Sequence, residues 1–168
     1  PTGRVWERAE IERAMEVYAA HDCVVISDEI WSDIILPGHT HIPTQQVSDW
    51  AHDHVVSLYA PSKTFNLAGL IGSYHMIYNP WLRDRIEKEQ SLSHYNSQNV
   101  LSMHGLIGAY SEEGSAWTDE LCQVLSENVN YATDKLPSYE GVTCAKAEVT
   151  YVLLADNWID RKSGSAGM

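Results

Sequence analysis

The chain has 168 residues, 44% of them hydrophobic, which is enough to bury a globular core. Its 23 acidic and 11 basic residues give a formal net charge of −12, which excludes nucleic acid and membrane surfaces as partners, because their phosphates attract clustered Lys and Arg. No apolar run approaches the roughly 20 residues of a spanning helix, and 3 widely spaced cysteines favour neither a disulfide framework nor a zinc knuckle, so we expect a soluble, cytoplasmic protein.

The first half of the chain alternates predicted helix and strand. Residues 7–22 place apolar side chains at helical spacing, and residues 23–26 form a short apolar run that is typical of a strand in a parallel sheet. Residues 36–53 are rich in Pro, Gly, His, Thr and Gln without periodicity, which predicts a long loop. Residues 54–59 and 72–78 are the second and third candidate strands. This order predicts an α/β fold.

The second half of the chain is mainly helical. The pair 79–80, Asn-Pro, offers a cap and a first-turn proline to a helix over 81–93. A further helix is predicted over 96–110. Gly and Ser at 114–115 break the pattern before a long amphipathic helix over 117–135.

A separate small sheet is expected after the long helix. Residues 142–144 and 149–155 are its two candidate strands. We therefore predict a partial large α/β domain over 1–113, then an interdomain helix with the start of a small domain over 114–160. Residues 161–168 are linker-like and are predicted to be a frayed tail.

Lys63 is the first candidate for chemistry, because it follows a predicted strand in a turn that also holds Pro61 and Ser62. In an α/β sheet the carboxyl ends of strands open onto the ligand crevice, so a lysine there can reach a bound aldehyde. Such a lysine needs an amine pKa that is depressed by burial or by a neighbouring cation, and an adjacent Ser can bind a phosphate oxygen. The alternative is an ordinary solvated lysine.

Asp28 is the second candidate, since it closes the strand that begins near residue 24. A buried carboxylate at that edge can hold a pyridinium nitrogen protonated, which keeps a cofactor ring an effective electron sink. The alternative is an Asp that caps a turn.

Three segments together carry a family resemblance. Residues 1–3 read Pro-Thr-Gly, residues 27–33 read Ser-Asp-Glu-Ile-Trp-Ser-Asp, and residues 60–70 read Ala-Pro-Ser-Lys-Thr-Phe-Asn-Leu-Ala-Gly-Leu. In order and spacing they resemble class I/II aminotransferases that depend on pyridoxal 5′-phosphate (PLP), and most of all the cystathionine β-lyase branch of carbon–sulfur lyases. The resemblance extends to about residue 160. It implies part of the large domain of the aspartate-aminotransferase fold, followed by a long helix and the start of a small α+β domain.

The resemblance implies a role for each site residue. Lys63 holds the cofactor and moves the Cα proton of an amino-acid substrate. Asp28 pairs with the pyridine nitrogen, and Ser62 helps to hold the phosphate. Trp31 stands where many aminotransferases place a Tyr that donates to the 3′-oxygen of the cofactor, and its indole can donate only one hydrogen bond.

Two departures from the wider family favour a lyase over a transaminase. The first is Trp31, and the second is Ile71, which stands where a phosphate-binding Arg is common. The resemblance also implies that a glycine-rich phosphate turn, a ring-stacking aromatic residue and a carboxylate-binding Arg lie outside this chain. The chain by itself is then expected to supply about half of an active site.

The function implied is a carbon–sulfur β-lyase that converts a sulfur amino acid such as cystathionine to a thiol, pyruvate and ammonia, and that is a homodimer in its full-length form. A PLP-dependent aminotransferase is the alternative within the family. The alternative of another class is a truncated, non-catalytic remnant.

No metal site is predicted. Four histidines, at 39, 41, 52 and 54, lie in or beside the predicted loop without the helical spacing of a metal-binding motif. We expect solvated loop histidines.

Overall fold

The computed structural model describes residues 3–94 and 97–157. The described residues form two compact units. The large unit comprises residues 6–33 and 41–118, and the small unit is formed by the described parts of 1–5, 34–40 and 119–168. No helix within the described stretches is long and apolar enough to cross a membrane. The predicted domain boundary at residue 113 stays a prediction.

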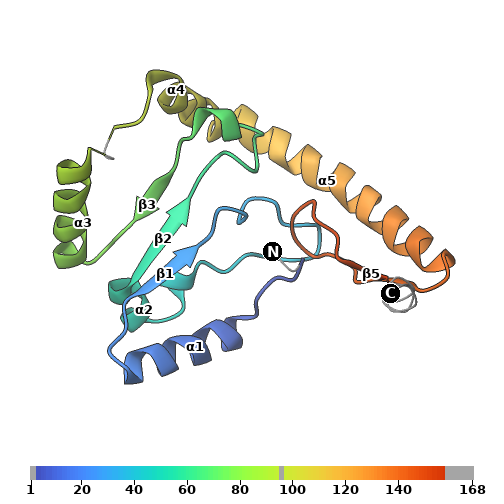
Figure 1. Cartoon of the computed structure of the whole chain (residues 1–168), viewed down its shortest axis with the longest axis horizontal. Helices are drawn as coiled ribbons and strands as arrows, with labels where there is room; N and C mark the ends of the chain where they lie inside the picture. The colour runs from blue at the N-terminus through green and yellow to red at the C-terminus, as the bar shows by residue number, and fades with distance from the viewer. Residues whose placement is uncertain (1–2, 95–96, 158–168) are drawn as a thin grey trace, which may run out of the picture. The chain divides into compact units, whose positions relative to one another are not determined.

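A three-stranded sheet organises the large unit (Figure 1). β1 (Val25–Asp28) pairs in parallel with β2 (Val55–Tyr59), so that Asp28 lies opposite Leu58. β3 (Tyr74–Met76) pairs antiparallel with the other edge of β2. All three predicted strands are present, and the parallel sheet expected for the first of them is confirmed.

Helix α1 (Arg8–Ala20) packs its apolar side into the core of the large unit. The carboxylate Oε2 of Glu10 accepts a hydrogen bond from the Glu7 amide at 2.9 Å, which satisfies one donor at the start of the helix. The predicted helix over 7–22 is confirmed. The buried core that it helps to form consists of Met15, Val47, Ala51 and Val55.

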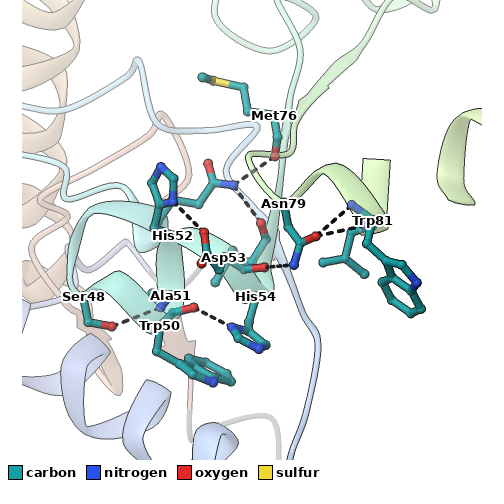
Figure 2. A network of polar contacts seen from close by, with 12 residues as sticks. Ser48, Trp50, Ala51, His52, Asp53, His54, Met76, Asn79 and Trp81 are labelled. Carbon is teal, nitrogen blue, oxygen red and sulfur yellow. Dashed lines mark hydrogen bonds and ion pairs between the residues drawn. The ribbon is translucent and has the colours of Figure 1, made fainter. Parts of the chain in front are cut away.

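The predicted loop over 36–53 is wrong at its second half. It contains a 3₁₀ turn, η1 (Thr44–Gln46), and a short helix, α2 (Asp49–His54). Ser48 caps this helix, since its Oγ accepts a hydrogen bond from the Ala51 amide at 3.1 Å (Figure 2). Ala51 is fully buried. A helix this short shows no periodicity in the sequence, and it is held by its cap and by the burial of Ala51 in the core.

Two side-chain amides tie these elements to the sheet. The Nε2 of buried Gln45 donates to the carbonyl oxygens of Val55, at 2.7 Å, and Met76, at 3.0 Å. Asn79 donates to the Asp53 carbonyl at 3.0 Å and accepts from the Trp81 amide at 2.9 Å (Figure 2). The second contact caps α3 (Pro80–Ser93) and confirms the predicted Asn-Pro helix start.

The junction of the next two helices corrects a second prediction. α4 (Val100–Ala109) lies within the predicted helix 96–110, whose first residue lies outside the described residues. α5 (Glu112–Lys135) runs through Gly114 and Ser115, where a break was predicted. A Cβ on Gly114 would lie 1.9 Å from the carbonyl oxygen of Ala109. The glycine therefore allows the close approach of two helix ends and does not end a helix.

The small unit holds most of α5, the 3₁₀ turn η3 (Leu136–Ser138) and a two-stranded antiparallel sheet of β4 (Val142–Cys144) and β5 (Ala155–Asn157). β4 confirms the prediction for 142–144. The predicted strand over 149–155 is wrong, because only its last residue lies in β5. The core of the small unit consists of Leu36, Val129 and Ala147.

Residues 148–150 instead pair with the segment 34–36. Val149 forms an isolated bridge with Ile35, and the amide of Thr150 donates to the Ile34 carbonyl at 2.9 Å. Thr150 has a φ of +68°, which interrupts an extended strand. The sequence pattern could not reveal this partner, since it lies far away along the chain. The predicted tail, 161–168, lies outside the described residues.

Candidate active site

Asp28 and Lys63 lie at the same edge of the large unit's sheet. β1 and β2 are parallel, so their carboxyl ends meet at one edge, where ligands bind in α/β folds. Asp28 is the last residue of β1, and Lys63 lies in the turn that follows β2. None of the hydrogen bonds or ion pairs among the described residues joins the two side chains.

Asp28 is exposed, and its Oδ1 accepts a hydrogen bond from the Ile30 amide at 3.2 Å. The carboxylate thus makes the local contact that is expected of an Asp that caps a turn. A carboxylate has several acceptor positions, so this contact leaves room for a further donor.

The turn that carries Ser62 and Lys63 is held by its own backbone. The Phe65 amide donates to the Pro61 carbonyl at 2.9 Å, and the Leu67 amide donates to the Ser62 carbonyl at 3.1 Å. Ser62 and Lys63 are half-buried. Both side chains are therefore partly accessible to solvent at the end of β2.

Lys63 and Trp31 are in contact. The Nζ of Lys63 lies 5.6 Å from the centroid of the Trp31 ring, within the range of a cation–π interaction. The structure therefore brings two of the predicted site residues together directly. Ser62 lies beside them in the turn, and Asp28 lies on the neighbouring strand.

Asp33 links the two motif segments and was missed in the sequence. Its Oδ2 accepts hydrogen bonds from the hydroxyls of Thr64, at 3.0 Å, and Tyr110, at 3.3 Å. Thr64 is only 1% exposed. Burial, a hydrogen bond with Tyr74 and the charge of Asp33 raise the pKa of Tyr110. The only available signal was the presence of Asp33 and Thr64 within the two motif segments.

An aromatic cluster surrounds this link. The ring of Phe65 packs edge-on against Tyr110, with centroids 5.6 Å apart, and lies 5.8 Å from the ring of Trp117. Tyr110 also packs edge-on against Tyr74 at 5.9 Å. Such ring pairs contribute to stability beyond the area that they bury. The segment just after Lys63 is therefore held by the contacts of Phe65 with Tyr110 and Trp117.

Glu29, the residue next to Asp28, is a second feature that the sequence did not single out. It is only 5% exposed, and five groups donate hydrogen bonds to its carboxylate. The donors are the Ser27 hydroxyl, His41 Nε2, the Thr44 amide, the Ser57 hydroxyl and the Tyr59 hydroxyl. They come from β1, from β2 and from the segment 36–53, which the sequence predicts to be a loop. A charged residue after a buried strand is a weak signal, because it usually faces solvent.

The donors keep Glu29 ionised. Burial by itself raises the pKa of a carboxyl group, but hydrogen bonds from His41 and from the Thr44 amide outweigh it and lower the pKa of Glu29 to about 2. Burial and the charge of Glu29 in turn raise the pKa of Tyr59. Glu29 is therefore a buried carboxylate that stays ionised, directly after the end of β1.

The predicted loop histidines have separate partners. His41 binds Glu29 at 2.8 Å. Figure 2 shows that His52 binds Asp53, at 2.9 Å, and that His54 binds the carbonyl oxygen of Trp50, at 2.9 Å. In the small unit His39 lies 4.0 Å from Glu148. Within the described part of the chain no group of three His, Cys, Asp or Glu side chains can hold a metal ion.

The groups at the sheet edge fit PLP by their chemistry. The Lys63 amine can bind an aldehyde, the Asp28 carboxylate can accept a hydrogen bond from a protonated ring nitrogen, and the Ser62 hydroxyl can donate to a phosphate. Trp31 adds one indole donor and an aromatic face. This set suits a flat, phosphorylated aromatic aldehyde better than it suits a metal ion.

Comparison with known proteins relates the chain to one family. The sequence model of the aminotransferase class I and II family matches residues 1–157. Cystathionine beta-lyase PatB of Bacillus subtilis is 34% identical over 164 residues, which are 95% of this chain and 40% of PatB. Aspartate aminotransferase of the same organism is 26% identical over 155 residues, 91% of this chain and 38% of that enzyme.

Among solved structures, the PLP-bound C-S lyase from Staphylococcus hominis matches with a TM-score of 0.86 and 31% identity. The match covers 100% of this chain and 43% of the lyase. The predicted mixed α/β fold of the PLP-dependent aminotransferases is thereby confirmed. The chain spans about 40% of the length of the relatives that it matches.

Proposed function

The chain belongs to the aminotransferase class I and II family, and we propose on that basis that it supplies the lysine segment of a PLP-dependent carbon–sulfur β-lyase. The observation that carries the proposal is the meeting of Asp28 and the Lys63 turn at one edge of the sheet, through the parallel pairing of β1 and β2. The higher identity to PatB, 34% against 26% for the aspartate aminotransferase, favours the lyase.

Each site residue has a role in this proposal. Lys63 Nζ binds the cofactor and takes the Cα proton from the amino-acid substrate. The Asp28 carboxylate holds a proton at the ring nitrogen, and the Ser62 hydroxyl donates to the phosphate. Trp31 lies against the Lys63 side chain and limits the directions in which the amine can point. When bound, PLP supplies an electron sink for the charge left at Cα.

The substrate proposed is a sulfur amino acid such as cystathionine, with a thiol, pyruvate and ammonia as products. The whole protein is proposed to act as a cytoplasmic homodimer, to which residues 1–113 contribute part of the large domain. The segment 114–160 then contributes the interdomain helix and the start of the small domain.

Cofactor capture tests the site. The chain is incubated with PLP and reduced with borohydride, and the modified peptide is identified by mass spectrometry. We expect the adduct on Lys63, and Lys63→Ala should remove it without redirecting it to another lysine. Equal labelling of exposed lysines such as Lys88 would contradict the site and favour the non-catalytic remnant.

Product analysis separates the two enzyme classes. A lyase releases pyruvate and a thiol from cystathionine without an added keto acid. A transaminase requires a keto acid and releases no thiol. In the whole protein, Asp28→Asn should lower either activity by at least tenfold, because the ring nitrogen loses its anionic partner.

A further inference from the structure

We propose that Asp33 is a positioning residue for Lys63 and acts through the buried hydroxyl of Thr64. This inference rests on the proposed role of Lys63 as the cofactor lysine. It concerns the contacts that fix the position of the Lys63 turn, which the motif segments by themselves do not explain.

The first step is the position of Thr64 in the turn. It directly follows Lys63, is only 1% exposed, and donates its hydroxyl hydrogen to Asp33 Oδ2 at 3.0 Å. A hydrogen bond to an ionised acceptor is stronger than a neutral one, and burial protects it from competing water. The backbone next to the Lys63 side chain is therefore anchored to the segment that follows Asp28.

The second step is that Thr64 joins the turn to the segment after β1. The hydrogen bonds from the Phe65 and Leu67 amides are internal, so they shape the turn without fixing it against a neighbour. The Thr64–Asp33 hydrogen bond and the approach of Lys63 to Trp31 join this turn to residues 31–33, and the ring of Phe65 packs against Tyr110 and Trp117. The Thr64 hydrogen bond is directional and lies on the residue next to Lys63, so we assign the positioning to it.

The third step is that Asp33 is held from two sides. It follows the turn in which the Ser32 amide donates to the Glu29 carbonyl at 3.0 Å, and the Glu29 carboxylate is anchored by its five donors. On the other side Tyr110 donates to the same Asp33 oxygen at 3.3 Å, while its ring packs on Phe65. Supporting contacts of this kind hold a reactive group in place.

The experiment measures competition between two lysines in the same molecule. The chain is labelled with PLP and borohydride, and the ratio of adduct on Lys63 to adduct on exposed Lys88 is determined by peptide mass spectrometry. Thr64→Val keeps the shape of the side chain but removes the hydroxyl, and we expect the ratio to fall about tenfold, as for loss of a hydrogen bond to a charged group. Thr64→Ser restores the hydroxyl and should keep the ratio within about twofold of the unaltered chain.

Two further variants separate positioning from general loss of stability. Ser48→Ala removes the α2 cap, away from the Lys63 turn, and should leave the ratio unchanged although it destabilises the fold. Asp33→Asn should lower the ratio in the unaltered chain but have little further effect in the Thr64→Val background, since both changes weaken the same contact. An unchanged ratio in Thr64→Val, or independent effects of the two substitutions, would overturn the proposal.

Hydrogen exchange of the cofactor-free chain provides a second measurement. The Phe65 and Leu67 amides should exchange faster in Thr64→Val than in Thr64→Ser, because the turn has lost its anchor. If the unaltered chain shows no preference for Lys63, the proposed function fails, and the exchange comparison then tests the anchor separately. Equal exchange in the two variants would refute the anchoring role of Thr64.

Discussion

At the scale of single residues, two carboxylates that the motifs did not emphasise organise the site. Glu29 binds the end of β1 to β2 and to the segment around His41, and Asp33 binds the lysine turn. Neither is a predicted cofactor contact. Glu29 is buried and Asp33 is half-buried, and the donors to each of them join the segments that carry Asp28 and Lys63.

The lowered pKa of Glu29 makes stability depend on pH. Its pKa is 4.5 in the unfolded chain and about 2 in the folded one. A depressed pKa stabilises the fold above the unfolded value, so this contribution, on the order of 3 kcal/mol, is present at neutral pH and is lost between roughly pH 5 and pH 2. The test is urea unfolding of the chain and of Glu29→Gln over this range. The variant should be less stable at pH 7, and the difference should disappear near pH 2; a constant difference would contradict the prediction.

Ile71 is a second residue with a measurable consequence. It has a φ of +56° and is 86% exposed, so a β-branched side chain occupies a left-handed conformation with little packing to offset the strain. Ile71→Gly should raise the free energy of unfolding by about 1 kcal/mol, because glycine adopts this conformation without a steric cost. In the preceding turn Ala68→Gly is the matched control and should lower stability, since no positive φ is relieved there.

At the scale of elements, a glycine was misinterpreted because its neighbours were unknown. Gly114 lies inside α5, close to the carbonyl oxygen of Ala109 at the end of α4. The sequence shows a poor helix former, whereas the structure shows a space too small for a side chain. The helix start is supported by the Ser111 hydroxyl, which accepts a hydrogen bond from the Gly114 amide at 3.2 Å.

Two alanine substitutions test this explanation. Gly114→Ala places a Cβ 1.9 Å from a backbone oxygen and should destabilise the chain by about 2–3 kcal/mol. Gly108→Ala, in α4, meets no atom within 4 Å and should stabilise the chain by up to about 1 kcal/mol through helix propensity. Thermal unfolding followed by circular dichroism distinguishes the two. Similar effects of both substitutions would show that propensity, and not crowding, decides the junction.

At the scale of the whole molecule, many large apolar side chains of the described residues are exposed. In the large unit Ile26 is 70% exposed, Leu101 is 69% exposed and Ile107 is 66% exposed. Apolar surface of this kind favours association in water. The formal charge of −12 opposes association but does not remove the driving force.

We therefore expect the purified chain to associate with increasing concentration. Lysine substitutions at Leu101 and Ile107 together should shift it towards the monomer in light scattering, because they place charge on the apolar surface. Gln123→Lys, at an exposed and already polar position of α5, is the control and should have a smaller effect per charge. A monomer at high concentration in the unaltered chain would contradict the prediction.

The sequence by itself determined the elements whose signals are local. The amphipathic spacing of α1, the apolar runs of β1 and β2, and the Asn-Pro start of α3 were all predicted within a few residues. The sequence motifs also identified the family, which the comparisons confirm. Local signals suffice there because each depends on neighbours along the chain.

Only the tertiary structure decided the rest. The partner of Val149 is Ile35, and the close neighbour of Gly114 is Ala109. Asp33 accepts a hydrogen bond from Thr64 in the lysine turn and another from Tyr110. These contacts join residues that the fold brings together, and their strength depends on burial, which no residue reveals in isolation.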